Sequence, residues 1–170
     1  MFKKFLFVLV CFTAAGVGVY AYQLDQLPPP DERRTAPRFS LPDSEGVERT
    51  LDTWKDQVLV INFWATWCPP CREEIPAFTK IQDELGSKGL QFIGIAIEEA
   101  EPVREFMQQF PVNYPMLIAP DNGMSLMAEF GNTMGVVPFS VVLDRSGRIV
   151  HMQPGVFEPD QVKKWVAPLL

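Results

Sequence analysis

The chain has 170 residues, which leaves room for one domain and a terminal segment. Its content of 47% hydrophobic and 21% charged residues is close to the globular average and excludes a disordered protein. With 15 Lys and Arg against 21 Asp and Glu, the net charge of −6 argues against a nucleic acid partner, because phosphates require a basic surface.

The N-terminal segment is a candidate membrane anchor. Residues 5–22 are uncharged and mostly apolar, and as a helix they would span about 27 Å, close to the roughly 30 Å core of a bilayer. Lys3 and Lys4 precede this run and Asp25 follows it, which makes residues 1–4 a cytoplasmic basic tip and orients the following domain to the extracytoplasmic (periplasmic) side. A cleaved signal peptide would instead leave a soluble periplasmic domain. The run exceeds the apolar length of about 7–15 residues usual for signal peptides, so we predict an uncleaved single-pass anchor.

A proline-rich stretch separates the apolar run from the rest of the chain. Residues 23–38 contain Pro28, Pro29 and Pro30, followed by a charged cluster. This composition favours extended polyproline conformations and cannot bury a core. We therefore predict a linker over residues 23–38 and one globular domain over residues 39–170.

The domain shows the hydrophobic patterns of an α/β fold. Continuous apolar runs predict buried strands over 58–65 and 90–97. Between them, apolar residues at three- and four-residue spacings predict a helix over 70–85 that ends at Gly86. The polar positions of this helix, including Glu73 and Glu74, are assigned to its other face. Strand, helix and strand with short connections imply a right-handed parallel crossover.

The remaining elements complete a mixed sheet flanked by helices. In chain order, we expect a small hairpin over 39–51, a helix over 102–110, a short strand over 116–118, a short helix over 125–130, hairpin strands over 140–143 and 148–152, and a last helix from Pro159. His151, on one of these strands, is expected to have a structural role.

Cysteine usage leaves one candidate site. Cys11 lies in the apolar segment and is interpreted as a filler, whereas Cys68 and Cys71 fall where strand 58–65 gives way to the helix. Unpaired N–H groups and the dipole at a helix N-terminus stabilise an anion, and Arg72 adds positive charge, so the pKa of the accessible Cys68 thiol should fall. Cys71, one turn further, should be buried and keep a higher pKa. This asymmetry is typical of thiol–disulfide exchange, in which Cys68 attacks a partner disulfide and Cys71 resolves the mixed disulfide.

Other uses of a Cys-x-x-Cys pair fit the sequence less well. Haem attachment requires His after the second cysteine, and residue 72 is Arg. Structural zinc needs four ligands, yet there is no second cysteine pair and His151 is the only histidine. A structural disulfide across so short a loop would contribute little stability. We therefore predict redox chemistry with no metal and no cofactor.

Three separated features resemble the thioredoxin superfamily, and specifically its membrane-anchored, extracytoplasmic TlpA/ResA-like members. They are NFWATWCPPC at 62–71, Pro76, and GVVPFSVVLD at 135–144. The resemblance covers about residues 37–170 and implies a thioredoxin-like fold. It also implies a cis peptide bond at Pro138, which exposes the backbone of Val137 to an extended substrate segment. Trp67, beside Cys68, is expected to form part of the same docking surface.

One position departs from the resemblance. Asn62 stands where cytosolic thioredoxins carry a buried Asp that assists the second cysteine, so that role is vacant. The resemblance implies a Glu just beyond the next strand instead, and Glu98 and Glu99 are the candidates. Counting from the strand end favours Glu99 as the residue that modulates the thiols. The alternative is that this carboxylate is simply solvated.

The leading hypothesis is a reductase of disulfides in exported proteins, such as apocytochrome c, supplied with electrons by an integral membrane thiol carrier. The resemblance, and not the local motif, provides this substrate. Net oxidation or isomerisation stays open, because Pro69 and Pro70 fix no redox potential. A copper-binding assembly chaperone is a further alternative, although no Met/His cluster of the kind that soft metals prefer accompanies the cysteines.

Overall fold

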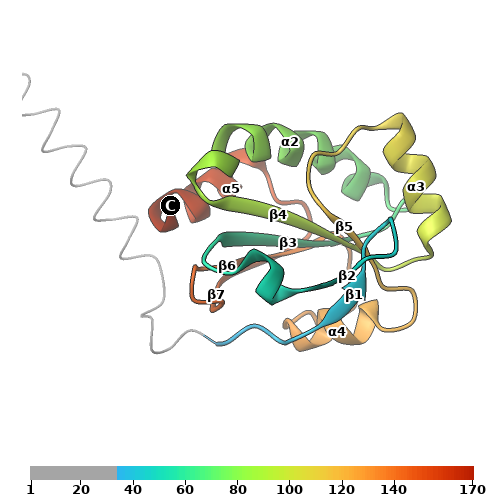
Figure 1. Ribbon diagram of the computed structural model, residues 1–170, viewed down its shortest axis with the longest axis horizontal. Helices are drawn as coiled ribbons and strands as arrows, with labels where there is room; N and C mark the ends of the chain where they lie inside the picture. Colours follow the sequence, from blue (N-terminus) through green and yellow to red (C-terminus); the bar gives the residue numbers. More distant parts are fainter. Residues whose placement is uncertain (1–33) are drawn as a thin grey trace, which may run out of the picture.

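The computed structural model describes residues 34–170, which form a five-stranded sheet with helices on both faces (Figure 1). The strand order is β5-β4-β3-β6-β7. Strands β3, β4 and β5 are parallel, and β6 is antiparallel to both β3 and β7. The strands are β3 (Val58–Trp64), β4 (Leu90–Ala96), β5 (Met116–Ile118), β6 (Phe139–Leu143) and β7 (Ile149–Pro154).

Different elements cover the two faces of the sheet. One face packs against α2 (Pro69–Leu85), α3 (Ala100–Gln109) and α5 (Pro159–Val166). The other packs against α4 (Gly123–Glu129), the 3-10 helix η1 (Leu51–Trp54) and the hairpin of β1 (Ser40–Pro42) and β2 (Glu48–Thr50). Figure 1 shows α2 and α5 above the sheet and α4 below it. Two short 3-10 helices, η2 (Gly86–Lys88) and η3 (Ala167–Leu169), lie near the ends of α2 and α5.

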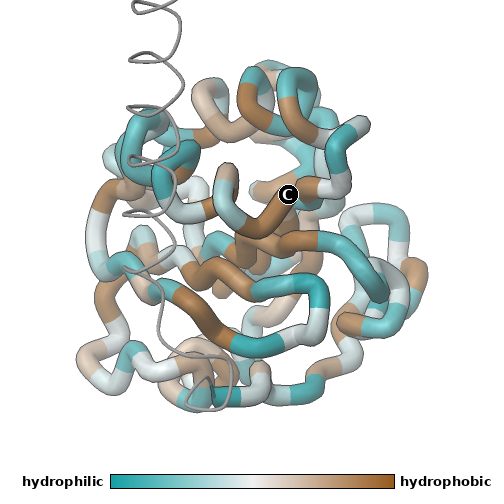
Figure 2. Tube along the Cα trace, turned by 90° about the vertical axis from the view of Figure 1, so that its left-hand side faces the viewer, coloured by the Kyte–Doolittle hydropathy of each residue, from teal (hydrophilic) through white to brown (hydrophobic). Residues whose placement is uncertain are grey.

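The central strand β3 is buried along its whole length because both faces of the sheet are covered. Val58, Val60 and Trp64 belong to the core on the α2 side, whereas the intervening Leu59, Ile61 and Phe63 belong to the core on the α4 side. Figure 2 shows hydrophobic stretches of the chain running through the middle of the domain, with hydrophilic stretches at its edges. The continuous apolar run of β3 therefore contributes side chains to both cores. The C-terminal end of β3 leads into the segment that carries the two cysteines.

The mixed α/β architecture and the order of elements expected from the sequence are confirmed. Strand β5 has the expected bounds, and most other elements differ by one or two residues. The fold also includes the end of the predicted 23–38 linker. Thr35 forms a β-bridge with Arg148, and the N–H of the buried Ala36 donates to the carbonyl of Gly147 at 3.0 Å. Burial of Ala36 and these backbone bonds hold this segment on the domain.

The predicted anchor at 5–22, the basic tip at 1–4, Cys11 and most of the predicted linker lie outside the described residues. Among residues 34–170, no helix is long and apolar enough to cross a membrane.

Candidate active site

Cys68 and Cys71 are joined by a disulfide at the N-terminus of α2, with their Cα atoms 5.3 Å apart. Cys68 is the N-cap residue, and two prolines occupy the first helical positions, where a missing N–H has no cost. The backbone N–H of Cys71 donates to the Sγ atom of Cys68 at 3.3 Å. After reduction, the same N–H and the helix dipole would stabilise a thiolate at Cys68, so the lowered pKa expected for this thiol stays a prediction. The predicted placement of the cysteines at a strand-to-helix junction is therefore confirmed.

The two cysteines differ less in exposure than the sequence suggested. Cys71 is fully buried, as expected, but Cys68 is only 4% exposed. The expectation of an accessible Cys68 is wrong for the oxidised form, because its Sγ is bonded to that of Cys71 and lies against the first turn of α2. The neighbouring Trp67 is 64% exposed, and Pro69 between the two cysteines is exposed as well.

A buried polar network lies behind the disulfide and centres on Glu74 of α2, which is 5% exposed. Asn62 of β3 donates from Nδ2 to Glu74 Oε1 at 2.7 Å and is 3.0 Å from Ser140 Oγ. The N–H of Phe157 donates to Glu74 Oε2 at 3.0 Å. Burial raises the pKa of Glu74 to about 7, and the charge of Glu158 acts in the same direction. The hydrogen bonds from Phe157 and Asn62 oppose this shift in pKa.

Asn62 carries an amide and cannot act as a buried acid near the cysteines, whereas Glu74 places a buried carboxyl group there. It follows Cys71 by three residues on α2, so the two side chains are neighbours on one helical face. With a pKa of about 7, the carboxyl group can take up or release a proton at neutral pH. It is therefore suited to accept the proton of the Cys71 thiol when the mixed disulfide is resolved, and to return it in the reverse reaction.

The assignment of Glu74 to the exposed face of the helix was wrong. The apolar positions Cys71, Ile75 and Phe78 are spaced as i, i+4 and i+7, and position 74 is the i+3 member of the same buried stripe. This spacing could have identified Glu74 from sequence. Its charge led to the opposite assignment.

The structure brings Glu98, and not Glu99, to the active-site loop. The carboxylate of Glu98 accepts hydrogen bonds from the backbone N–H of Thr66 and from Thr66 Oγ1, the latter at 2.9 Å. Glu99 is exposed and is the N-cap of α3. Counting favoured Glu99 because the strand was expected to reach residue 97, whereas β4 ends at Ala96. An effect of either carboxylate on the thiols stays a prediction.

Pro138 lies at the same end of the sheet as the cysteines. Phe139 at the start of β6 pairs with Phe63 near the end of β3, so Pro138 is level with the segment that leads to Cys68. The bond between Val137 and Pro138 is cis, as the resemblance implied. Pro138 is buried and Val137 half-buried. Participation of Val137, Pro138 and Trp67 in substrate binding stays a prediction.

His151 has surroundings typical of a structural residue. Its ring stacks on Trp165 of α5 with centroids 4.0 Å apart and an interplanar angle of 12°. Burial lowers the pKa of His151, and the charge of Lys164 acts in the same direction, whereas the hydrogen bond with Gln153 opposes them. Within residues 34–170, no group of three His, Cys, Asp or Glu side chains is placed to hold a metal ion.

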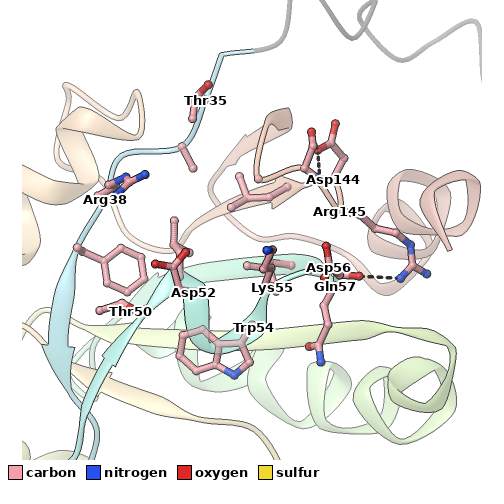
Figure 3. A pocket seen from close by; sticks show the side chains of 17 residues that line it. Thr35, Arg38, Thr50, Asp52, Trp54, Lys55, Asp56, Gln57, Asp144 and Arg145 are labelled. Carbon is pink, nitrogen blue, oxygen red and sulfur yellow. Dashed lines mark hydrogen bonds between the residues drawn. The ribbon is translucent and has the colours of Figure 1, made fainter.

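A pocket of about 780 Å³ lies at the other end of the sheet (Figure 3). Its walls include Leu59 and Leu143, which pair with each other where β3 starts and β6 ends, far from the cysteines. In this pocket Arg145 donates from Nη1 to the carbonyl of Asp56 at 2.9 Å, and from Nη2 to the carbonyl of Lys88 at 3.2 Å. Its guanidinium thus holds neighbouring turns together. None of the residues that line this pocket is a cysteine, and the redox-active pair lies at the opposite end of the sheet, so the disulfide is the candidate active site.

A mixed sheet with helices on both faces, a disulfide at the N-terminus of the helix after the central strand, and a facing cis-proline loop define a thioredoxin-like thiol–disulfide oxidoreductase. Residues 31–167 match the Redoxin family, and the chain belongs to that family. Its similarity to the TlpA/ResA-like group is equally evident from individual relatives and structures.

Two curated relatives illustrate this similarity. Thiol-disulfide oxidoreductase ResA of Bacillus thuringiensis subsp. konkukian is 26% identical over 169 residues, covering 98% of this chain and 94% of that protein. Thioredoxin-like protein YneN of Bacillus subtilis is 32% identical over 137 residues, covering 78% and 77%. Among solved structures, a thiol:disulfide interchange protein of the thioredoxin family from Chlorobium tepidum has a TM-score of 0.72 and 29% identity, covering 81% of this chain and 97% of that one.

Proposed function

We propose that this thiol–disulfide oxidoreductase reduces disulfides of exported proteins, apocytochrome c among them, on the periplasmic side of the membrane. The apolar run at 5–22 supports a membrane-anchored location, because basic residues precede it and the acidic Asp25 follows it. An integral membrane thiol carrier would then return the protein to its dithiol form.

The reaction consists of two exchanges at Cys68. The thiolate of Cys68 attacks one sulfur of the partner disulfide, which forms a mixed disulfide and releases one partner thiolate. Cys71 loses its proton to Glu74 and attacks Cys68 Sγ, which closes the intramolecular disulfide and releases the second partner thiolate. Two electrons pass to the partner, and the protein is left in the oxidised form that the structure shows.

The observation that carries the reducing direction is the buried carboxyl of Glu74. A strong oxidant such as DsbA owes its high potential to a stabilised reduced form. Glu74 acts against such stabilisation, because its partly ionised carboxyl lies one helical turn from Cys71 and disfavours further negative charge on the thiols. The disulfide form is thereby favoured relative to the dithiol, as expected for a donor of electrons.

The redox potential of the Cys68–Cys71 couple tests this proposal. We expect a value toward the −270 mV or so of thioredoxin and far from the roughly −120 mV of DsbA. The measurement equilibrates the protein in dithiothreitol redox buffers at pH 7 and quantifies free thiols by alkylation. A potential above about −180 mV, the value of protein disulfide isomerase, would rule out a reductase and support oxidation or isomerisation.

A further inference from the structure

The loop between α4 and β6 contains a buried polar residue with exposed neighbours. Asn132 is 6% exposed, whereas Thr133 is exposed and Met134 is 76% exposed. Burial of an amide side chain is costly without hydrogen bonds. The hydrogen bonds of Asn132 therefore show how it holds the loop of residues 133–137, which precedes Pro138.

Asn132 closes the 133–137 loop with its side chain and its backbone. Its Nδ2 atom donates to the carbonyl of Val136 at 2.6 Å. Its backbone N–H donates to the carbonyl of Met127 in α4 at 3.1 Å, and its carbonyl accepts from the N–H of Gly135 at 3.4 Å. Gly135 has a φ of +66°, a conformation that side chains disfavour. The loop is thus tied to α4 and held in a single turn.

This arrangement leaves the backbone of Val137 unpaired. The carbonyl of Val136 is bound by Asn132, and the carbonyl of Pro138 accepts from the N–H of Gly155 at 2.9 Å. No hydrogen bond within residues 34–170 engages the N–H or the carbonyl of Val137, which lies between them. An extended segment of another polypeptide can pair with such a backbone as an added strand.

The same loop displays apolar side chains. Met134 is 76% exposed and Val136 is 44% exposed. Met124 of α4, 48% exposed, lies against Gly135 of this loop, since a Cβ atom added at Gly135 would be 2.7 Å from its Cε. Methionine side chains adapt to partners of different shape. An unpaired backbone group flanked by exposed apolar side chains fits an extended, apolar polypeptide.

We propose that Asn132 is a positioning residue for protein substrates. It holds the 133–137 loop so that Val137 pairs with an extended segment beside the partner disulfide, and so that Met134 and Val136 contact apolar side chains of that segment. This inference rests on the proposed thiol–disulfide exchange and adds the residue that positions the substrate-binding loop. A small disulfide, which has no polypeptide segment to bind, does not depend on Asn132.

The test replaces Asn132 with Asp, which keeps the shape but turns the donor into an acceptor facing the carbonyl of Val136. The change leaves the carbonyl of Val136 without its donor and opposite a carboxylate, so we expect the KM for oxidised insulin to rise at least about fivefold. The rate with hydroxyethyl disulfide should stay within about twofold of wild type, and the redox potential should not change. The matched control is Asn122→Asp. Asn122 is the exposed N-cap residue of α4, and its side chain makes no capping hydrogen bond. The KM of this variant for insulin should equal that of wild type.

Met134→Gln examines the same loop without risk to folding, because this side chain is 76% exposed. We expect a severalfold increase in the KM for insulin with kcat maintained. An unchanged KM in both variants, or an equal loss of activity toward hydroxyethyl disulfide in Asn132→Asp, would overturn the proposal. If Asn132→Asp does not fold, the result for Met134→Gln decides. Absence of wild-type activity toward hydroxyethyl disulfide would instead contradict the proposed function itself.

Discussion

Cys71→Ala is expected to accumulate mixed disulfides between Cys68 and partner proteins. The thiolate at the N-cap of α2 still attacks, but the thiol that resolves the intermediate is gone. Cys68→Ala should trap almost nothing, because Cys71 is fully buried and cannot reach a partner. Both variants should lose multiple-turnover activity completely. The adducts are measured on non-reducing gels after alkylation of the membrane fraction, and reductant should cleave them.

Mass spectrometry of the trapped adducts would identify the partners. Cytochrome c apoproteins together with a membrane thiol carrier would support the proposed reductase. A copper-site protein would favour a role in oxidase assembly, and periplasmic folding enzymes would favour oxidation or isomerisation. Adducts formed by Cys68→Ala and not by Cys71→Ala would reverse the assignment of the nucleophile and contradict the helix N-terminus argument.

Glu74→Gln is expected to change both stability and the pH dependence of catalysis. The pKa of Glu74 is about 7 in the folded protein, above its ordinary value of 4.5. The unfolded chain therefore releases this proton more readily, so the contribution of Glu74 to stability is fully present below about pH 4.5 and is lost as pH rises through 7. A shift of this size corresponds to about 3 kcal/mol. The stability of the Gln variant should not show this decrease between pH 4.5 and pH 7. Its resolving step should be about 100-fold slower near pH 7, because the proton acceptor for the Cys71 thiol is absent.

Glu73→Gln is the matched control, because Glu73 is the adjacent residue of α2 and is exposed. Urea unfolding from pH 4 to pH 8 gives the stability, and single-turnover oxidation of the reduced protein gives the rate of resolution. His151 also affects stability in this range: its pKa is lowered, so its contribution to stability is lost as pH falls below its ordinary value of 6.5. Both variants contain His151, so comparing them removes this contribution. Identical pH profiles for the two variants would show that Glu74 does not govern either property.

The sequence predicted most of the fold because its strongest patterns are local. The run in β3, the amphipathic spacing of α2 and the turn before β7 each indicate one element without reference to the rest of the chain. The cysteines could be placed for the same reason, since a short-range junction of strand and helix determines their position.

The features that escaped prediction depend on contacts between distant residues. Burial of Glu74 is supported by the N–H of Phe157, 83 residues later in the chain, and no local pattern shows that contact. The choice between Glu98 and Glu99 depended on a strand end, where a shift of one residue exchanges the two side chains. The role of Asn132 likewise requires the observed path of the loop between α4 and β6.

The rate of alkylation of the reduced protein as a function of pH tests the central claim most directly, because it reports which cysteine is the nucleophile. With iodoacetamide and peptide mapping between pH 4 and pH 9, Cys68 should be labelled with an apparent pKa below the ordinary thiol value of about 8.5. Cys71 should remain unlabelled in the folded protein. Labelling of Cys71 at a rate equal to that of Cys68, or an apparent pKa of Cys68 at or above the ordinary value, would contradict the account.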